Sequence, residues 1–197
     1  MIYPTFIKKG DTIGVCAPSN GITREAKVNR FNHAIESIHE KGYQVIETPH
    51  VRTNDDYASS DAKMRAQELA SLYQNQEVKA IICATGGEFL LEMLTFFDFS
   101  VVKNNIKWLQ GYSDPTGLLF TITTNLDIAT IYGHNFAGFG MDVWHKSLEN
   151  NWDILNGNLI VQKSFDYYES APNEEVTGLE EYHLDTPVYW KNLRDEE

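Results

Sequence analysis

An alternation of short strand-like runs with helical segments constrains the fold of this chain most. The apolar runs with the length of buried strands are Thr12–Ala17, Tyr43–Ile46, Val78–Ala84, Lys107–Gly111 and Ile128–Tyr132. The segments between them carry apolar residues near helical spacing and are Thr23–Lys41, Asp61–Tyr73, Glu88–Phe97 and Asp114–Thr123. Strands joined through helices pair in parallel by right-handed crossovers. The sequence therefore predicts an α/β fold: a mainly parallel sheet flanked by helices on both faces, with Val78–Ala84 as a central strand.

The pattern changes after about Gly138. Spacing indicates one more helix over Asp142–Leu155 and a strand over Asn158–Phe165. The rest is acidic, loop-like and extended, with no closing helix or strand pair. We therefore expect an α/β domain over residues 1–140 and an aromatic-rich extension over residues 141–197 that resembles a linker to a further domain.

Charge and composition exclude several classes of partner. Lys and Arg number 16 against 28 Asp and Glu, so the net charge is −12, which argues against nucleic acid and anionic membranes as partners. No apolar run reaches the roughly 18 residues of a membrane helix. Cys16 and Cys83 each lie in a strand-like run, which favours buried thiols in a reducing cytoplasm over a disulfide or a metal pair.

No metal or cofactor is expected either. The six histidines show no metal-ligand spacing, and the chain has no glycine-rich nucleotide-phosphate motif.

Ligands of parallel sheets collect at the carboxyl ends of the strands. Three such ends carry polar or glycine residues, namely 18–20, 85–87 and 112–114. The paired glycines Gly86 and Gly87 either let a backbone N–H approach a ligand or only form a tight turn. His134 follows a strand toward the same edge, although a hydrogen-bonded structural histidine is the simpler interpretation.

Ser113 is the most informative residue at this edge. A strand ends in Gly111, turns at Ser113, and a helix begins at Asp114-Pro115. A serine on such a turn presents its hydroxyl above the sheet, close to N–H groups that could stabilise an oxyanion. The alternative is that Ser113 or Asp114 only caps the helix. The α/β-hydrolase motif G-x-S-x-G does not fit, because its fifth position is Pro115.

Five segments, in order, resemble the LD-carboxypeptidase family of serine peptidases, which includes muramoyl-tetrapeptide carboxypeptidases and microcin C self-immunity peptidases. The segments are GDTIGVCAPS, YASSDAKMRAQEL, VKAIICATGGEFLL, GYSDPTGLL and YGHN. The resemblance runs from about Lys9 to Asn135. Relatives often have arginine where Thr85 stands and proline where His134 stands, which leaves the substrate class open.

The resemblance implies roles for individual residues. Ser113 would be the nucleophile, the backbone N–H groups of Gly87 and Asp114 the oxyanion hole, and Gly86 and Trp190 substrate-binding residues. In the family a glutamate and a histidine from a C-terminal domain complete the site, and no residue here matches them. We therefore expect the N-terminal half of a serine carboxypeptidase that is inactive by itself.

The expected partner is a small peptide or an aminoacyl-nucleotide, that is, a murein LD-peptide or a microcin C-like conjugate. The family also tends to form homodimers. The alternative function is a non-catalytic binding module for small molecules or peptides that keeps the family's sheet and has lost the catalytic triad.

Overall fold

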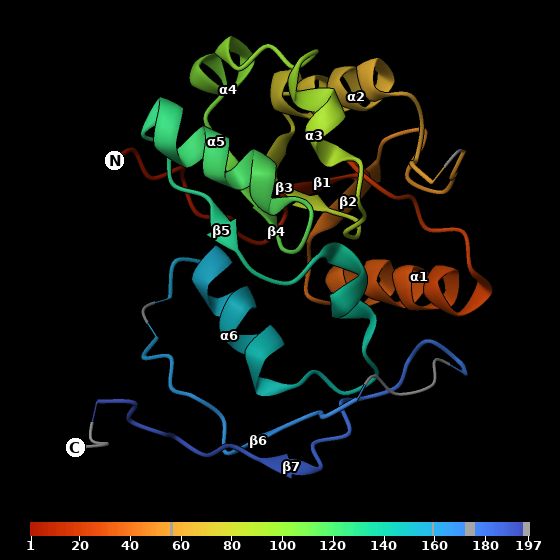
Figure 1. Ribbon diagram of the computed structural model, residues 1–197. Helices are drawn as coiled ribbons and strands as arrows, with labels where there is room; N and C mark the ends of the chain where they lie inside the picture. The colour runs from red at the N-terminus through yellow and green to blue at the C-terminus, as the bar shows by residue number, and fades with distance from the viewer. Residues whose placement is uncertain (56, 159, 172–175, 195–197) are drawn as a thin grey trace.

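A computed structural model describes residues 1–55, 57–158, 160–171 and 176–194. At its centre is a five-stranded sheet in the order β2-β1-β3-β4-β5, in which all neighbouring strands are parallel (Figure 1). The strands are β1 (Thr12–Cys16), β2 (Gln44–Glu47), β3 (Val78–Cys83), β4 (Trp108–Gly111) and β5 (Ile131–Tyr132). The predicted α/β fold is confirmed, and β3 is its central strand.

Helices cover both faces of the sheet (Figure 1). One face carries α2 (Ala62–Gln74), α3 (Leu90–Leu94), α4 (Ser100–Asn104) and α5 (Thr116–Leu126). The other carries α1 (Glu25–Glu40), the short 3₁₀ helix η1 (Phe136–Gly140) and α6 (Lys146–Leu155). Two separate apolar cores result, one on each side of the strands.

The central strand shows why the sequence folds this way. Ala80 and Ile82 belong to the core under α1, while Ile81 and Cys83 belong to the core under α2 and α5. Successive side chains of a strand point to opposite faces, so a continuous apolar run is buried on both sides. This is the pattern of a strand inside a covered parallel sheet.

The packed unit extends beyond residue 140. Leu148 and Leu155 of α6 are fully buried in the α1-side core, and Trp152 packs edge-on against Tyr43 at 5.0 Å between ring centroids. The helix begins at Lys146 rather than at residue 142, because His145 caps it by accepting the Ser147 N–H. The division expected at residue 140 therefore falls inside the packed body, which runs through Leu155.

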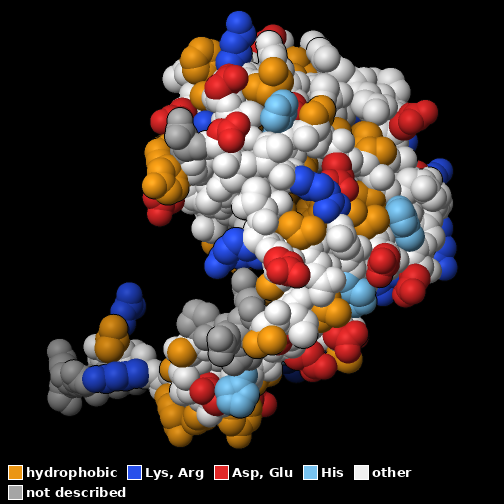
Figure 2. Space-filling model, turned by 90° about the vertical axis from the view of Figure 1, so that its right-hand side faces the viewer, with side chains coloured by type: hydrophobic (Ala, Val, Ile, Leu, Met, Phe, Trp, Pro, Cys, Tyr) orange, Lys and Arg blue, Asp and Glu red, His pale blue; other side chains and the backbone are white. Residues whose placement is uncertain are grey.

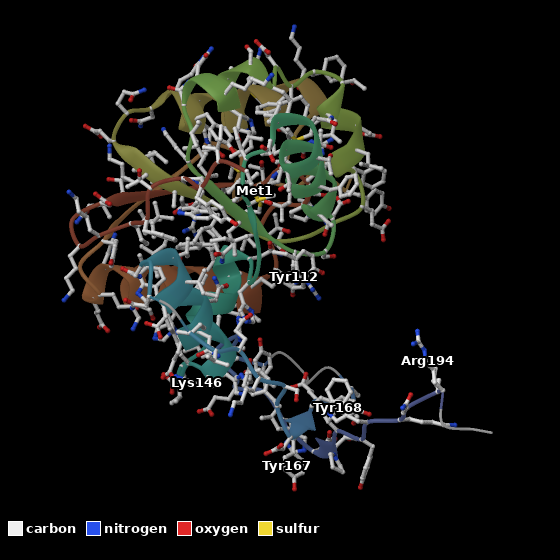
Figure 3. The ribbon with its side chains drawn as sticks, turned by 90° about the vertical axis from the view of Figure 1, so that its left-hand side faces the viewer. Met1, Tyr112, Lys146, Tyr167, Tyr168 and Arg194 are labelled. Atoms are coloured by element: carbon white, nitrogen blue, oxygen red, sulfur yellow. The ribbon has the colours of Figure 1, made fainter. Side chains whose placement is uncertain are left out.

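Beyond α6 the chain forms an extension with little regular structure. The strand expected over Asn158–Phe165 is wrong: among the described residues of that stretch, none pairs with another strand. Two short strands follow, of which β6 (Tyr167–Tyr168) pairs antiparallel with β7 (Thr186–Pro187). Figure 2 shows the extension as a narrow arm below the rounded body, and in Figure 3 Tyr167, Tyr168 and Arg194 lie on that arm.

Candidate active site

Ser113 lies on a tight turn between β4 and α5, at the carboxyl edge of the sheet. Its φ of 66° is a left-handed conformation that is unfavourable for a residue other than glycine. The Thr116 N–H donates to the Ser113 carbonyl oxygen at 3.0 Å and closes the turn. Gly111 makes the turn possible, because a Cβ there would lie 2.9 Å from Pro115 Cβ. The Ser113 side chain is exposed, as the sequence predicts.

Asn135 fixes the residue before the nucleophile candidate. Its buried side chain accepts the Tyr112 N–H at 3.1 Å and donates to the Tyr112 carbonyl at 3.3 Å. The amide thus pairs with Tyr112 as a neighbouring strand would, beyond the point where β5 ends. Sequence reasoning assigned no role to this residue, although it stands within the YGHN segment.

The two glycines after β3 lie beside this turn. A Cβ on Gly86 would lie 3.1 Å from the Cβ and Oγ of Ser113 and 3.9 Å from the Asp114 nitrogen. A Cβ on Gly87 would lie 2.1 Å from Ser19 Oγ. A side chain on Gly87 would therefore force its neighbours to move, whereas one on Gly86 would crowd Ser113. The structure thus brings together the segments that hold the expected nucleophile and oxyanion donors.

The Asp114 carboxylate points away from the hydroxyl of Ser113 and toward the other strand ends. Its Oδ2 accepts the Ser19 hydroxyl at 2.5 Å and the Leu90 N–H at 2.9 Å. These bonds explain why α3 begins at Leu90 instead of residue 88, since the carboxylate holds the first N–H of the helix. This side-chain role was not apparent from the sequence.

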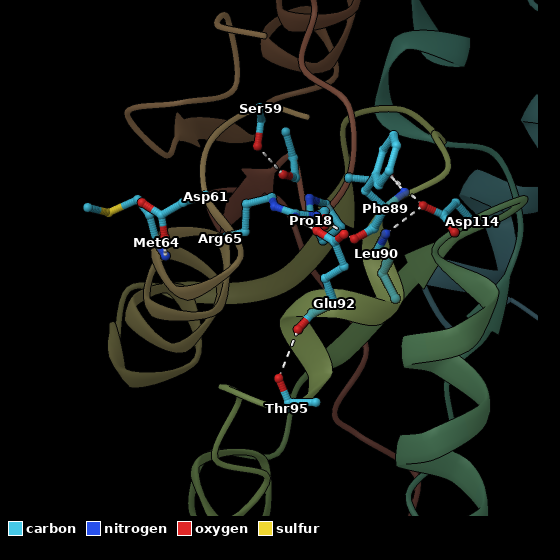
Figure 4. A network of polar contacts seen from close by, with 12 residues as sticks. Pro18, Ser59, Asp61, Met64, Arg65, Phe89, Leu90, Glu92, Thr95 and Asp114 are labelled. Atoms are coloured by element: carbon cyan, nitrogen blue, oxygen red, sulfur yellow. Dashed lines mark hydrogen bonds and ion pairs between the residues drawn. The ribbon is translucent and has the colours of Figure 1, made fainter. Parts of the chain in front are cut away.

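Arg65 of α2 lies under the same loops (Figure 4). One guanidinium nitrogen, Nη1, donates to the carbonyl oxygens of Pro18 at 2.9 Å and Phe89 at 2.8 Å. The residue is 2% exposed. Burial lowers the pKa of Arg65, while the carboxylates of Glu92 and Asp114 act in the opposite direction. Arg65 thus places a cation beneath the site and joins the loops after β1 and β3.

A polar cavity of about 400 Å³ opens above Ser113. Its described lining includes Gly86, Gly87 and Ser113 from the two strand ends, and Arg24 and Lys27 from the start of α1. Asn20 also lines it, and its buried Oδ1 has no hydrogen-bond partner within the described part of the chain. The described residues around the cavity include two cations and no carboxylate, although the whole chain is strongly acidic.

His134 is directed away from Ser113. Its ring nitrogen Nε2 lies 3.2 Å from Ser147 Oγ. Its backbone N–H donates to Asn151 Oδ1, and its backbone carbonyl accepts a hydrogen bond from Gln110 Nε2. Burial, reinforced by His145 and Arg30, lowers the pKa of His134 to about 4. The ring is therefore neutral at pH 7 and engaged on the α6 side, which agrees with the structural interpretation of this histidine.

Trp190 lies far along the extension. It is 84% exposed and is not among the described residues that line the cavity around Ser113. Tyr182 of the extension comes closer, since it lines a second cavity together with Tyr112 and His134. Figure 3 shows Tyr112 on the side of the body nearer the arm.

The two cysteines are buried and free, and they face each other on β1 and β3. Hydrogen bonding to Cys83 and burial raise the pKa of the Cys16 thiol. Among the described residues there is no group of three or more His, Cys, Asp or Glu that could hold a metal ion. Within the same ranges, no helix is long and apolar enough to cross a membrane.

Comparison with known proteins agrees with this geometry. Residues 13–133 match the sequence profile of the LD-carboxypeptidase N-terminal domain, peptidase family S66. The microcin C7 self-immunity protein MccF of Escherichia coli is 36% identical over 124 residues, which cover 63% of this chain and 36% of MccF. A Bacillus subtilis protein named as a probable murein peptide carboxypeptidase is 28% identical over 184 residues, covering 92% of this chain and 55% of that protein.

Solved structures give the same result. The structure of MccF in its ligand-free state has a TM-score of 0.74 and 28% identity, and covers 98% of this chain and 58% of that one. MccF in complex with aspartyl sulfamoyl adenosine matches equally well, with a TM-score of 0.74. The chain spans about half the length of the relatives it matches. Sequence and structure together place this chain in the LD-carboxypeptidase family, as an N-terminal domain.

Proposed function

We propose that this chain is the nucleophile-bearing domain of a serine carboxypeptidase that cleaves an amide in a murein LD-peptide or an aminoacyl-nucleotide conjugate. The observation that carries the proposal is the exposed Ser113 in a left-handed conformation, with Gly86 against its side chain. Family relatives support both substrate classes, since one is named for murein peptides and another was solved with an aminoacyl-nucleotide analogue.

In the proposed reaction, Ser113 Oγ attacks the carbonyl carbon of the amide and its proton passes to a general base. The carbonyl oxygen becomes an oxyanion, which accepts hydrogen bonds from the backbone N–H groups of Gly87 and Asp114. Collapse of the intermediate expels the protonated amine and leaves an acyl-serine, which water then hydrolyses. The family resemblance assigns the base to a histidine of a second domain, held by a glutamate.

The charge around the cavity supports a substrate with a free carboxylate. Arg24 and Lys27 stand one helical turn apart and line the same cavity as Ser113. A carboxylate next to the scissile amide would be attracted to them, and hydrogen bonds to charged groups are stronger than those between neutral groups. We therefore propose that these two side chains bind the acidic end of the substrate.

The decisive experiment compares the 197-residue chain with the full-length gene product. Hydrolysis of an LD-tetrapeptide and of an aminoacyl-sulfamoyl adenosine is measured for both, each with a Ser113→Ala control. We expect turnover by the full-length product, none by Ser113→Ala, and little or none by the chain alone. Equal turnover by both lengths would require a base within this chain and would contradict the assignment to a second domain.

The alternative, a non-catalytic binding module, fits one observation equally well. Among the described residues, neither a carboxylate nor an imidazole is hydrogen-bonded to the Ser113 hydroxyl. If the full-length gene product binds either compound without hydrolysing it, and Ser113→Ala binds equally well, the binding module is the correct function.

Two further proposals concern the location of the protein in the cell and its oligomeric state. We propose that the protein works in the cytoplasm, which is supported by two buried free thiols. A homodimer, implied by the family resemblance, stays a prediction that analytical ultracentrifugation of the full-length gene product would test.

A further inference from the structure

We infer that Ser19 is a positioning residue whose hydroxyl sets the Gly87 peptide against the turn that carries Ser113. The inference rests on the proposed function, because it assigns Ser19 a part in forming the oxyanion hole. Ser19 is fully buried and follows β1, so it does not line the cavity itself. Its contacts join three separate segments at the carboxyl edge of the sheet.

The Ser19 hydroxyl bridges two of these segments directly. It donates to Asp114 Oδ2 at 2.5 Å, on the turn after β4, and accepts the Phe89 N–H at 3.3 Å, in the loop after β3. Both bonds use the one oxygen of a side chain with one donor and two acceptor sites. An alanine at this position would break both links and leave the partly buried Phe89 N–H without this acceptor.

The same oxygen also limits where Gly87 lies. A Cβ on Gly87 would come within 2.1 Å of Ser19 Oγ and 2.5 Å of Asn20 Oδ1, so the glycine backbone packs directly on these side chains. On either side of Gly87 the loop is anchored, since Gly86 O accepts the Asn20 N–H at 3.2 Å and Phe89 N–H donates to Ser19. Gly87 is therefore held between two contacts with the segment after β1.

The support beneath Ser19 is itself rigid. The Ala84 N–H donates to the Cys16 carbonyl and the Ser59 N–H to the Ser19 carbonyl, both at 2.8 Å. Arg65 joins the Pro18 and Phe89 carbonyls from below (Figure 4). An oxyanion donor must be placed to within a fraction of an ångström, and such supporting contacts are what maintain that placement.

Ser59 offers a matched control. It is also a fully buried serine at this edge, and its hydroxyl donates to the Ala17 carbonyl at 2.7 Å. Ser59→Ala thus removes a buried hydroxyl of the same size without breaking the contact to Asp114 or Phe89. Both variants should lower the melting temperature by a similar few degrees.

The test uses the full-length gene product with an LD-tetrapeptide and an aminoacyl-sulfamoyl adenosine. Ser19→Ala should lower kcat by about 10- to 100-fold with KM within about twofold, because the transition state loses a stabilising donor while ground-state binding is kept. Ser59→Ala should keep kcat within about twofold. Equal loss of kcat in both variants, or no loss in Ser19→Ala, would overturn the inference.

A conservative substitution of Asp114 separates the position of its oxygen from its negative charge. Asp114→Ala should resemble Ser19→Ala, whereas Asp114→Asn should recover at least about tenfold of that loss, since an amide oxygen can accept both hydrogen bonds now made to Oδ2. The double variant S19A/D114A should lose less than the product of the two single losses, because both single variants break the shared link between Ser19 and Asp114. A multiplicative loss, or no rescue by Asp114→Asn, would count against a positioning role.

Hydrogen exchange distinguishes a failure of this inference from a failure of the proposed function. In the full-length gene product, Ser19→Ala should speed amide exchange in residues 86–90 by at least about tenfold, whereas Ser59→Ala should not. If the wild type hydrolyses neither compound but exchange changes as expected, the proposed function fails and the positioning contact stands. If the wild type is active and exchange in this loop is unchanged, the inference fails alone.

Discussion

Around Ser113, backbone segments from three strand ends are fixed by buried side chains, whereas the extension is attached through α1 and through the segment just before α6. Asn135 and Asp114 hold the turn and the neighbouring loop. The extension is tied to α1 by Arg30, whose Nη1 donates to the Gly178 carbonyl at 2.7 Å, and further along the chain Trp190 is 84% exposed. The chemistry that we propose, which depends on sub-ångström placement, thus lies in the rigid region, and the ring expected to stack on a substrate lies in the loosely attached one.

The largest expected effect comes from removing the proposed nucleophile in the rigid region. Ser113→Ala should lower kcat of the full-length gene product by roughly 10⁴- to 10⁶-fold. The side chain is exposed, so the urea midpoint should change little. Initial rates together with urea unfolding check both statements. A variant that retains a tenth of the activity would show that Ser113 is only a turn residue.

The next effect concerns the glycine beside Ser19. Gly87→Ala would bring a Cβ to 2.1 Å from Ser19 Oγ, so the loop must move and carry its N–H away from the oxyanion. We expect kcat to fall by about 10²- to 10³-fold. Gly138→Ala is the control, because its Cβ would have an ordinary contact of 3.4 Å with His134. Equal losses in the two variants would argue against a special role for Gly87.

The difference between the two regions also decides what the sequence could predict. The strand ends at Gly86 and Ser113 were found because apolar runs stop there, and parallel pairing brings neighbouring ends together. The roles of Ser19, Asn135 and Arg65 depend on side-chain hydrogen bonds between residues distant in sequence. Local patterns contain no information on such partners, although each residue lies in a segment that resembles the family.

The extension was predicted less well for a different reason. The run Asn158–Phe165 has the composition of a strand, but a strand needs a neighbour with which to pair. The helix before it ends at Leu155 as predicted, because its apolar side chains pack on an existing core. Sequence pattern is thus reliable where tertiary packing agrees with it, and fails where no partner segment is at hand.

A smaller effect is expected from the cationic wall of the cavity. Lys27→Ala should raise KM by about tenfold for a substrate with a free carboxylate, with a smaller change in kcat. Lys63→Ala, an exposed lysine on α2, serves as the matched control. A substrate with its carboxylate amidated should show no difference between wild type and Lys27→Ala. A difference with the amidated substrate would mean that Lys27 acts on stability or on another group of the substrate.

Trp190 tests the loosely attached region directly. Trp190→Ala should raise KM for the aminoacyl-sulfamoyl adenosine by roughly fivefold, because an aromatic ring can stack on a nucleobase. KM for the LD-tetrapeptide, which has no base, should stay the same. Trp190→Phe should recover most of the loss. Equal effects on both compounds would place Trp190 outside the substrate-binding surface and leave the extension as a structural connection.

The smallest effect on activity is expected at His134, which lies where the two regions meet. Its ring contacts Ser147 of α6, and burial lowers its pKa to about 4 from an ordinary value near 6.5. His134→Gln should therefore change kcat at pH 7 by no more than about twofold, since the neutral ring does not reach Ser113. A loss of several orders of magnitude would instead make His134 the base and move the whole reaction into this chain.

The lowered pKa of His134 also predicts how the stability of the protein depends on pH. The folded state disfavours protonation, so between about pH 6.5 and 4 the unfolded chain binds more protons and the native state loses stability as the pH falls. The loss is at most about 3 kcal/mol, because each unit of pKa difference corresponds to about 1.4 kcal/mol. Urea unfolding at pH 7.5 and 4.5 should show a larger fall for the wild type than for His134→Gln, while His39→Gln, on the surface of α1, should behave as the wild type does. Equal falls in the wild type and His134→Gln would mean that the ring is hydrated, and that α6 packs on the sheet less tightly around His134 than the structure shows.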